Sequence, residues 1–268
     1  MASKPSQKKK IHLSPPKFIF KMAIIILIVL AIYIWSLWMT ESDPARLRSQ
    51  LPFIYEFIRD RFFPPDWEYF RTSFSYLVET WNMALIATTL AALISLPLTF
   101  LASNNINTNN TFYLVVRTAL NLLRTIPDIV LAILVVAFMG LGSVSGVVAL
   151  TIFTSGILAK MLSESTEGID NGPLDAITAS GGNKLQMIAF GVMPQIMPYY
   201  VSYTLYVLEI NIKSSVVLGF IGAGGIGNLL DRNLSFFNYD RIMMIIIVIF
   251  ITISIIDLIS NAVREALL

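Results

Sequence analysis

The stretch LIATTLAALI, residues 85–94, lies at the centre of an apolar run that extends from about Leu77 to Ala102. The run is long enough to cross a bilayer, which takes roughly 20 residues at about 1.5 Å per residue. Its residues do not alternate between apolar and polar, as they do in the strands of a membrane β-barrel. Because backbone groups in lipid must be satisfied within the chain, the run is predicted to be a transmembrane helix.

Five further apolar runs accompany this one. The predicted spans are, in order, Met22–Met39, about Leu77–Ala102, about Phe112–Leu141, about Val144–Leu162, about Met187–Ile212 and about Ile242–Ser260. Charged residues and Pro127 interrupt the third run, and Pro194 and Pro198 are expected to bend the fifth. The sequence therefore predicts an all-α membrane protein, a polytopic bundle of about six transmembrane helices.

The composition agrees with a bilayer as the solvent. Of the 268 residues, 56% are hydrophobic and 13% are charged, with a mean hydropathy of +0.71, whereas soluble domains carry about 25% charged residues. A net charge of +2 without a basic stripe argues against nucleic acid as a partner. The sequence has no cysteine and one histidine, His12, so we expect no catalytic residue, no metal site and no cofactor on this chain.

The distribution of positive charge predicts the topology. Residues 1–21 form a lysine-rich tail, expected to stay in the cytoplasm. Residues 22–40 are interpreted as an uncleaved first transmembrane helix rather than a signal peptide, because no small-residue cleavage pattern follows. Six spans then place both termini in the cytoplasm. The chain is expected to be a multi-pass protein of a prokaryotic plasma membrane, in contact with membrane lipid. Residues 77–268 are expected to form the core domain.

Residues 41–76 are predicted to be an extracytoplasmic amphipathic segment. Aromatic and charged residues follow one another at helical spacing up to Pro64. The segment is either a helix that lies on the outer membrane surface, ended by Pro64 and Pro65, or a packed linker.

The inner loop 163–186 differs from the other loops because it is acidic on balance. Asn171, Gly172 and Pro173 are typical of a helix start, and Gly181 and Gly182 of a helix end. The loop is therefore predicted to contain a short helix at about Pro173–Ser180. A loop that departs from the positive charge of inner loops suggests a surface for docking a partner.

This loop resembles the coupling motif of ABC importer permeases. The matching residues are Asp175, Ala176, Ile177, Gly181 and Pro194, with aspartate in place of the usual glutamate and isoleucine in place of the second alanine. The resemblance implies a type I ABC importer permease fold. It also implies two separate ABC ATPase subunits, which would bind ATP and Mg²⁺, and identifies the loop as their docking site.

Further stretches resemble phosphonate importer permeases, and the resemblance covers about residues 51–262. Residues 214–227 are the best match, but methionine-type permeases share this glycine-rich segment, and residues 124–128 resemble a signature of many of these permeases. Residues 63–67, together with 79–85, favour the phosphonate permeases. The resemblance implies that two copies of the chain import phosphonate, or a related anion such as phosphite, from an extracytoplasmic phosphonate-binding protein. A methionine-type permease or a permease for another small anion is the alternative.

The glycine-rich run includes Gly219, Gly222, Gly224, Gly225 and Gly227. It lacks the Gly-Lys-Ser/Thr ending of a nucleotide-binding P-loop. Small residues allow helices to approach closely and the backbone to bend. The run is therefore interpreted as a gate or re-entrant turn near the outer mouth, or as a helix-packing patch.

Ionisable residues in the predicted spans come in two pairs at a spacing of four, Arg124 with Asp128 and Glu209 with Lys213. Each pair can share one helical face, and each either lines an anion pathway or forms a structural ion pair. Other charged residues near span ends, Arg117, Lys160 and Asp257, are expected to extend to the membrane surface.

Two rival classes of protein fit the sequence less well. An ion-driven secondary transporter would show inverted repeats, and none is visible. An intramembrane enzyme would need a cluster of catalytic residues that the inventory does not supply.

Overall fold

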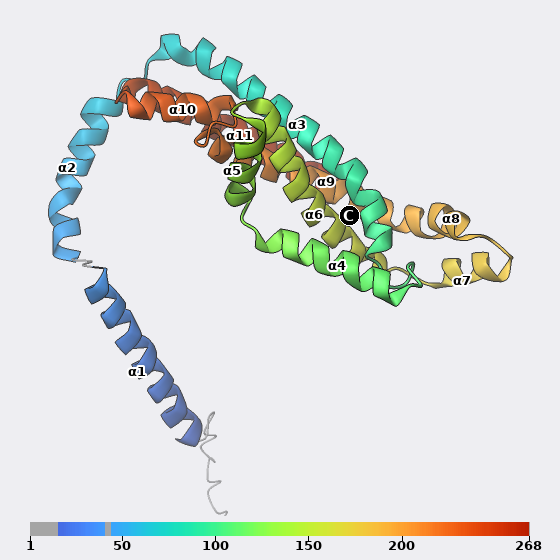
Figure 1. Ribbon diagram of the computed structural model, residues 1–268. Helices are drawn as coiled ribbons and strands as arrows, with labels where there is room; N and C mark the ends of the chain where they lie inside the picture. The colour runs from blue at the N-terminus through green and yellow to red at the C-terminus, as the bar shows by residue number, and fades with distance from the viewer. Residues whose placement is uncertain (1–15, 41–43, 268) are drawn as a thin grey trace, which may run out of the picture. The chain divides into compact units, whose positions relative to one another are not determined.

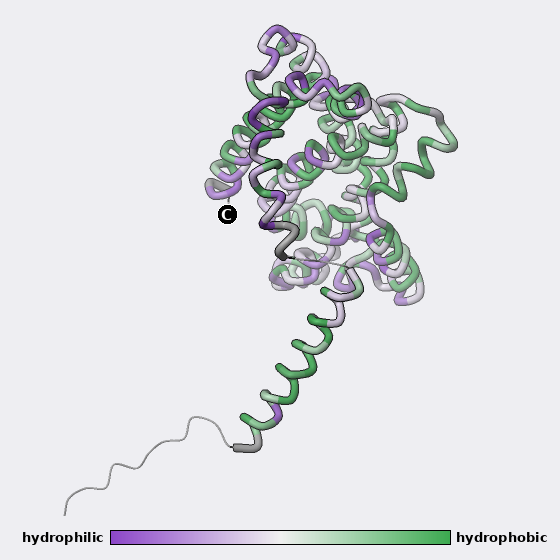
Figure 2. The backbone as a smooth tube through the Cα atoms, turned by 90° about the vertical axis from the view of Figure 1, so that its left-hand side faces the viewer, coloured by the Kyte–Doolittle hydropathy of each residue, from purple (hydrophilic) through white to green (hydrophobic). Residues whose placement is uncertain are grey.

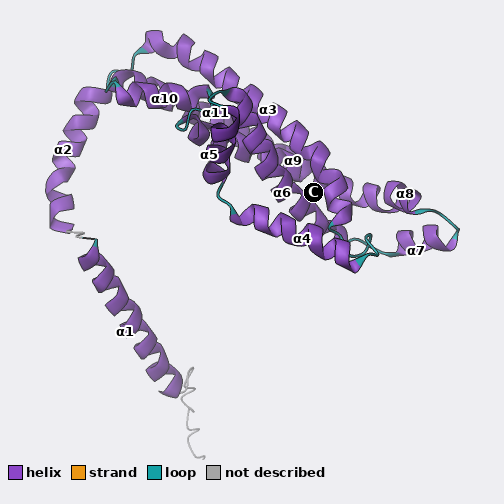
Figure 3. Ribbon diagram, in the orientation of Figure 1, coloured by secondary structure: helices purple, strands orange, loops and turns teal. Residues whose placement is uncertain are grey.

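The computed structural model describes residues 16–40 and 44–267, and these residues form helices joined by loops and turns (Figure 3). The chain divides into two compact units, Met1–Arg59 and Asp60–Leu268. The first contains α1 (Pro16–Met39) and most of α2 (Pro44–Phe62). The second contains the remaining elements, namely η1 (Trp67–Tyr69), α3 (Phe70–Leu101), α4 (Asn110–Thr125), α5 (Asp128–Met139), α6 (Ser143–Glu167), α7 (Gly172–Ala179), α8 (Lys184–Gln186), η2 (Met187–Val192), α9 (Met193–Gly219), α10 (Gly225–Ser235) and α11 (Tyr239–Leu267).

Helix α1 matches the first predicted span. Its residues Phe18–Met39 are long and apolar enough to cross a membrane, and none of that window is buried within the protein. Figure 2 shows the helix green, that is hydrophobic, over most of its length. A helix that is apolar on every side is suited to lipid rather than to a protein core with one buried face.

Helix α6 lies at the centre of the second unit. Of its most apolar 18 residues, 61% are buried, against 39% for α3 and 22% for α11. Small residues make this packing possible: Ala84, Ala87 and Ala91 on α3 are fully buried, and a Cβ on Gly146 of α6 would lie 2.9 Å from the carbonyl of Ala223. Close approach through small residues is the usual way in which membrane helices pack.

The number of spans differs in part from the prediction. In the described part of the chain, four helices, α1, α3, α6 and α11, are long and apolar enough to cross a membrane, and the pair α4 and α5 makes five if it is one broken span. The remaining predicted span corresponds to α9, which is 27 residues long but carries polar residues such as Asn211 and a Glu209–Lys213 pair. Length therefore allows α9 to span, whereas its composition is that of a helix surrounded by protein.

The third predicted span is not one continuous helix. Helices α4 and α5 are bent by 93° at the short break between Thr125 and Asp128. Ile126 is extended, with φ −82° and ψ 121°, as expected for a residue before proline. Pro127 then starts α5, where its missing N–H costs no helical hydrogen bond.

The second unit has two distinct ends (Figure 1). Helices α7 and α8 project at one end, and α10 and the start of α3 lie at the other. At the second end Asn233 donates a hydrogen bond to Tyr69, 3.3 Å away. Helix α3 begins at Phe70, earlier than the predicted Leu77, so segment 41–76 contains the start of this span.

Candidate functional site

Helix α7 forms where the sequence placed a short loop helix. It covers Gly172–Ala179, with Pro173 in its first turn. At its end Gly181 has a φ of +81°, and the N–H groups of Gly181 and Gly182 bond to the carbonyls of Thr178 and Ile177 at 3.0 and 2.9 Å. This pair of bonds is a Schellman motif, which favours glycine at the left-handed position.

One face of α7 is anchored and the other is free. Leu174 is 4% exposed and packs in a cluster with Ile106, Val192 and Ile196. Asp175 and Ala176, two residues of the predicted docking motif, are exposed. A hollow of about 480 Å³ beside them is lined by Ala176, Ile177, Ser180, Gly181, Gly182, Gln186 and Phe190. The fixed inner face and open outer face suit a docking surface, and docking itself stays a prediction.

Helix α7 is connected to the membrane helices through η2. Gly191 in η2 lies against α7, since a Cβ there would be 3.3 Å from both Leu174 and Ile177. Pro194, the last residue of the predicted motif, is exposed in the first turn of α9, directly after η2. A movement of α7 would therefore reach α9 through a short and rigid connection.

Glu167 ties the neighbouring loops to this end of the bundle. Its Oε1 accepts from Arg117, 2.6 Å away, and from the backbone of Asn104 at 3.1 Å. Arg117 pairs with this carboxylate, which lies 50 residues away in the sequence, and its expected extension to the membrane surface stays a prediction. Lys160 is 9% exposed at its side chain and pairs with Glu164 at 3.1 Å.

The glycine-rich run makes a tight crossing between α9 and α10. A Cβ on Gly219 would lie 2.5 Å from Gly227 Cα, and one on Gly225 would lie 2.5 Å from Thr80 Oγ1. Gly222, Gly224 and Gly225 all have positive φ. The N–H of Ile226 donates to Thr80 on α3 at 2.8 Å. Close packing accounts for the glycines, and a gating role stays a prediction.

The predicted Arg124–Asp128 pair does not form. The two residues lie on different helices across the 93° bend, so their spacing of four does not put them on one face. Asp128 accepts from Ser214 of α9 at 2.9 Å instead. Arg124 is exposed and, within the described part of the chain, makes no ion pair or side-chain hydrogen bond.

The predicted Glu209–Lys213 pair does form, at 2.7 Å. Glu209 also binds Arg264 of α11 at 2.9 Å, and Lys213 lies 3.3 Å from Asp257. Asp257 therefore faces α9, and its expected extension to the membrane surface stays a prediction. These four charges balance, two of each sign, and they join α9 to α11 as a structural network.

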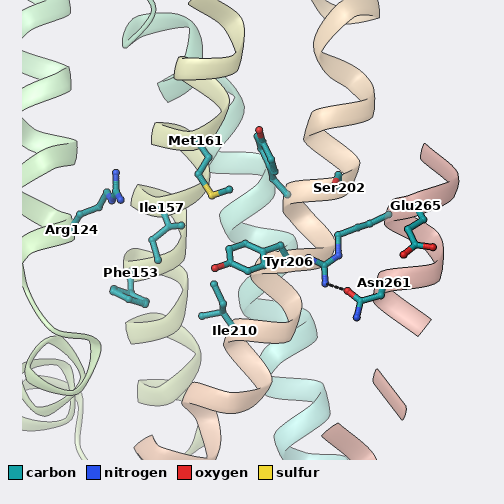
Figure 4. Close-up of a pocket in the computed structure, with 11 residues that line it drawn as sticks. Arg124, Phe153, Ile157, Met161, Ser202, Tyr206, Ile210, Asn261 and Glu265 are labelled. Carbon is teal, nitrogen blue, oxygen red and sulfur yellow. Dashed lines mark hydrogen bonds between the residues drawn. The ribbon is translucent and has the colours of Figure 1, made fainter. Parts of the chain in front are cut away.

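A groove of about 950 Å³ runs along α6 between α4 on one side and α9 and α11 on the other (Figure 4). Its lining is Arg124 from α4, Phe153, Ile157 and Met161 from α6, Ser202, Tyr203, Tyr206 and Ile210 from α9, and Asn261, Arg264 and Glu265 from α11. In Figure 4 Arg124 stands on the wall opposite Asn261 and Glu265. We call this site the α6 groove.

Of the three charged residues in the α6 groove, the sequence predicted Arg124 and missed Arg264 and Glu265. Arg264 lies 55 residues after its partner Glu209, and no local spacing could relate them. Arg264 lies in the last turn of α11, where basic residues are favourable in any helix. Its position in the sequence therefore does not by itself indicate a groove.

The chain matches the family described as "Binding-protein-dependent transport system inner membrane component" over residues 95–267. A phosphite transport system permease protein of Stutzerimonas stutzeri is 30% identical over 239 residues, covering 89% of this chain and 86% of that protein. A phosphate-import permease protein of Mycolicibacterium smegmatis is 33% identical over 208 residues, covering 77% of this chain and 39% of that protein.

Among solved structures, a methionine ABC transporter in an inward-facing conformation is similar to this chain with a TM-score of 0.65 and 22% identity. The match covers 72% of this chain and 94% of that one. At this identity the likeness concerns the fold, and it agrees with the type I permease fold predicted from the sequence.

Proposed function

Because the chain belongs to the family of binding-protein-dependent transport system inner membrane components, the transmembrane subunits of ABC importers, we propose that its cargo is a phosphonate or a related phosphorus oxyanion such as phosphite. The observation that carries the proposal is the likeness to a phosphite permease along nearly the whole chain. A methionine permease shares the fold at lower identity, and methionine is the competing cargo.

The assembly proposed for this function has three kinds of subunit: the permease, the ATPase and the binding protein. Two copies of the chain form the pore, and two ABC ATPase subunits carry ATP and Mg²⁺. Each ATPase takes one copy of α7 (Gly172–Ala179) in a groove. A phosphonate-binding protein delivers the anion to the far end of the bundle. The buried Leu174 and the exposed residues beside it support this use of α7, because an anchored helix with small exposed residues fits a partner's groove.

The proposed topology places α7 and both termini in the cytoplasm of a prokaryotic cell. The lysine-rich tail and the positive-inside bias support it. It puts α10 and the start of α3, at the opposite end of the second unit, on the side where the binding protein docks.

The docking assignment is tested with Gly181→Trp. A Cβ at Gly181 meets no atom within 4 Å, so the indole would project from the surface into the partner's space. We expect the variant to insert in the membrane but to lose co-purification with the ATPase and uptake. Gly181→Ala is the matched control, because it carries the same strain of a positive φ without the bulk. Normal uptake by Gly181→Trp would refute the docking assignment.

The cargo assignment is tested with the complete importer reconstituted in proteoliposomes. We expect ATP-dependent uptake of methylphosphonate, with competition by phosphite and none by methionine. Uptake of methionine in place of methylphosphonate would refute the assignment and favour the competing cargo.

A further inference from the structure

We propose that the α6 groove is a cargo-binding site within the permease itself, in which Arg124 binds one phosphorus oxyanion. The proposal rests on the proposed function for the kind of cargo. It assigns to this chain a binding site that is separate from the binding protein, and a residue that contacts the anion.

Arg124 lies at the level of the middle of α6. Its neighbour Leu123 packs on Gly156, where a Cβ would lie 2.6 Å from the leucine side chain. Gly156 is near the middle of α6, which runs from Ser143 to Glu167. Arg124 is therefore far from both ends of the central helix, where a long side chain could reach water along the surface.

The positive charge of Arg124 has no neutralising partner among the described residues. A cation at this depth is costly in lipid, and such residues face a cavity or a partner charge. Among the described residues no carboxylate neutralises Arg124, whereas Lys213, Arg264 and Arg117 each have one within 3 Å. An exposed guanidinium without a partner, turned into a groove, is suited to two parallel hydrogen bonds with an oxyanion.

On the opposite wall of the groove, the positive charge of Arg264 is already paired. Arg264 donates to Glu209 at 2.9 Å and to Asn261 at 2.9 Å, so its charge is already paired with a carboxylate. Its guanidinium also lies 5.8 Å from the centre of the Tyr206 ring. Arg264 thus holds the shape of the wall, and Arg124 supplies the free positive charge.

The lining suggests weak binding, as passage requires. Phe153, Ile157 and Met161 make an apolar floor that gives an oxyanion no hydrogen bond, and the uncharged polar side chains of the lining are those of α9 and α11, namely Ser202, Tyr203, Tyr206 and Asn261. Glu265 on the far wall repels an anion that leaves Arg124. One free cation opposed by one carboxylate allows the anion to enter and to depart, which conduction through a pore needs.

The test measures binding and transport separately. Binding of methylphosphonate to the detergent-solubilised permease–ATPase complex, without the binding protein, is followed by broadening of its ³¹P signal. Uptake and ATP hydrolysis are measured on the complete importer in proteoliposomes. The variants are Arg124→Gln and Arg124→Lys. For the binding measurement, which omits the binding protein, the control is Arg71→Gln, since Arg71 is also exposed and has no ion pair in the described structure, but lies in the first turn of α3, outside the groove.

We expect saturable broadening with the wild type and with Arg71→Gln, weaker broadening with Arg124→Lys, and none with Arg124→Gln. Uptake by Arg124→Gln should fall about tenfold or more, while ATP hydrolysis stimulated by the binding protein is kept. Retained assembly and hydrolysis show that Arg124→Gln has folded.

Two results would overturn the proposal. The first is wild-type binding and uptake by Arg124→Gln. The second is a wild type that transports methylphosphonate without any saturable binding to the permease. In both cases the cargo assignment still holds, but the proposal that the α6 groove binds the anion is wrong. Uptake of methionine alone would instead remove the proposed cargo, and the oxyanion site with it.

Discussion

At the scale of single residues, Glu209 holds two cations, Lys213 within α9 and Arg264 on α11, at 2.7 and 2.9 Å. We predict that a double-mutant cycle on Glu209→Gln and Arg264→Gln measures a coupling of about 1 kcal/mol or more. A charge-assisted hydrogen bond contributes roughly 1.5–3 kcal/mol, and part of this remains when both side chains are partly buried. The measurement is thermal unfolding of the detergent-solubilised protein.

The matched control is the same cycle on Arg124→Gln and Asp128→Asn. Because these two side chains do not pair, we expect a coupling below about 0.5 kcal/mol. A larger value would mean that the two residues meet in the membrane, despite the 93° bend between their helices. Absence of coupling between Glu209 and Arg264 would argue against the α9–α11 network.

Asn211 is a fully buried amide between three helices. Its Nδ2 donates to Thr88 of α3 at 2.8 Å, and its Oδ1 has no partner. Hydrogen bonds between membrane helices contribute about 0.6 kcal/mol on average and at most about 1.7 kcal/mol. We therefore predict that Asn211→Leu changes the free energy of unfolding by less than about 1.5 kcal/mol, as measured by thermal shift in detergent.

Asn211→Asp is the contrasting variant. It has nearly the same shape but buries a charge with no cation among its contacts, which are Thr88 and Thr154. We expect a loss of roughly 2–4 kcal/mol. Equal stability of the two variants would show that water or a cation reaches this position.

At the scale of elements, the crossing of α9 and α10 depends on a missing side chain. A Cβ on Gly219 would meet the backbone of Gly227 and of Asn228, each at 2.5 Å, and backbone cannot move aside as a flexible side chain can. We predict that Gly219→Ala lowers the free energy of unfolding by about 1–3 kcal/mol. The measurement is the temperature at which half of the detergent-solubilised protein has aggregated, which the substitution should lower.

Gly168→Ala is the control for this substitution. Its Cβ would lie 3.5 Å from the nearest atom, the carbonyl oxygen of Ser165, which is an ordinary contact. We expect a change within about 0.5 kcal/mol. A Gly219→Ala variant as stable as Gly168→Ala would mean that the two helices are looser than the structure shows.

The elements also show what the sequence could and could not predict. The bounds of α7 follow from Pro173 and Gly181, because a helix start and a left-handed end are local properties of a few residues. The absence of a pair between Arg124 and Asp128 could not be predicted from neighbouring residues. Its distance to Asp128 depends on the direction that α5 takes after Pro127, and that direction is set by packing on α6 and α9. Spacing along the chain therefore predicted Glu209–Lys213, within one helix, and failed for Arg124–Asp128.

At the scale of the whole molecule, α9 connects the three candidate sites. Its first turn follows η2, which packs on α7. Tyr206 in its middle lines the α6 groove, and Gly219 at its end crosses α10. One continuous helix, with Pro198 inside it, thus joins the surface proposed to dock the ATPase, the groove proposed to hold the anion and the glycine crossing. A displacement of α7 has a direct mechanical route to both other sites, as alternating access requires.

The orientation of the whole molecule can be tested because the sequence contains no cysteine. Leu185, in the middle of α8, is 77% exposed, and Phe236, directly after α10 at the opposite end, is 70% exposed. With α7 and α8 in the cytoplasm, a membrane-impermeant maleimide should label Phe236→Cys in intact spheroplasts and leave Leu185→Cys unlabelled. Inverted vesicles made without the ATPase should give the reverse, and the cysteine-free parent should give no signal. The opposite pattern would invert the proposed topology, whereas labelling of both variants from one side would show that the two ends do not lie across a membrane from each other.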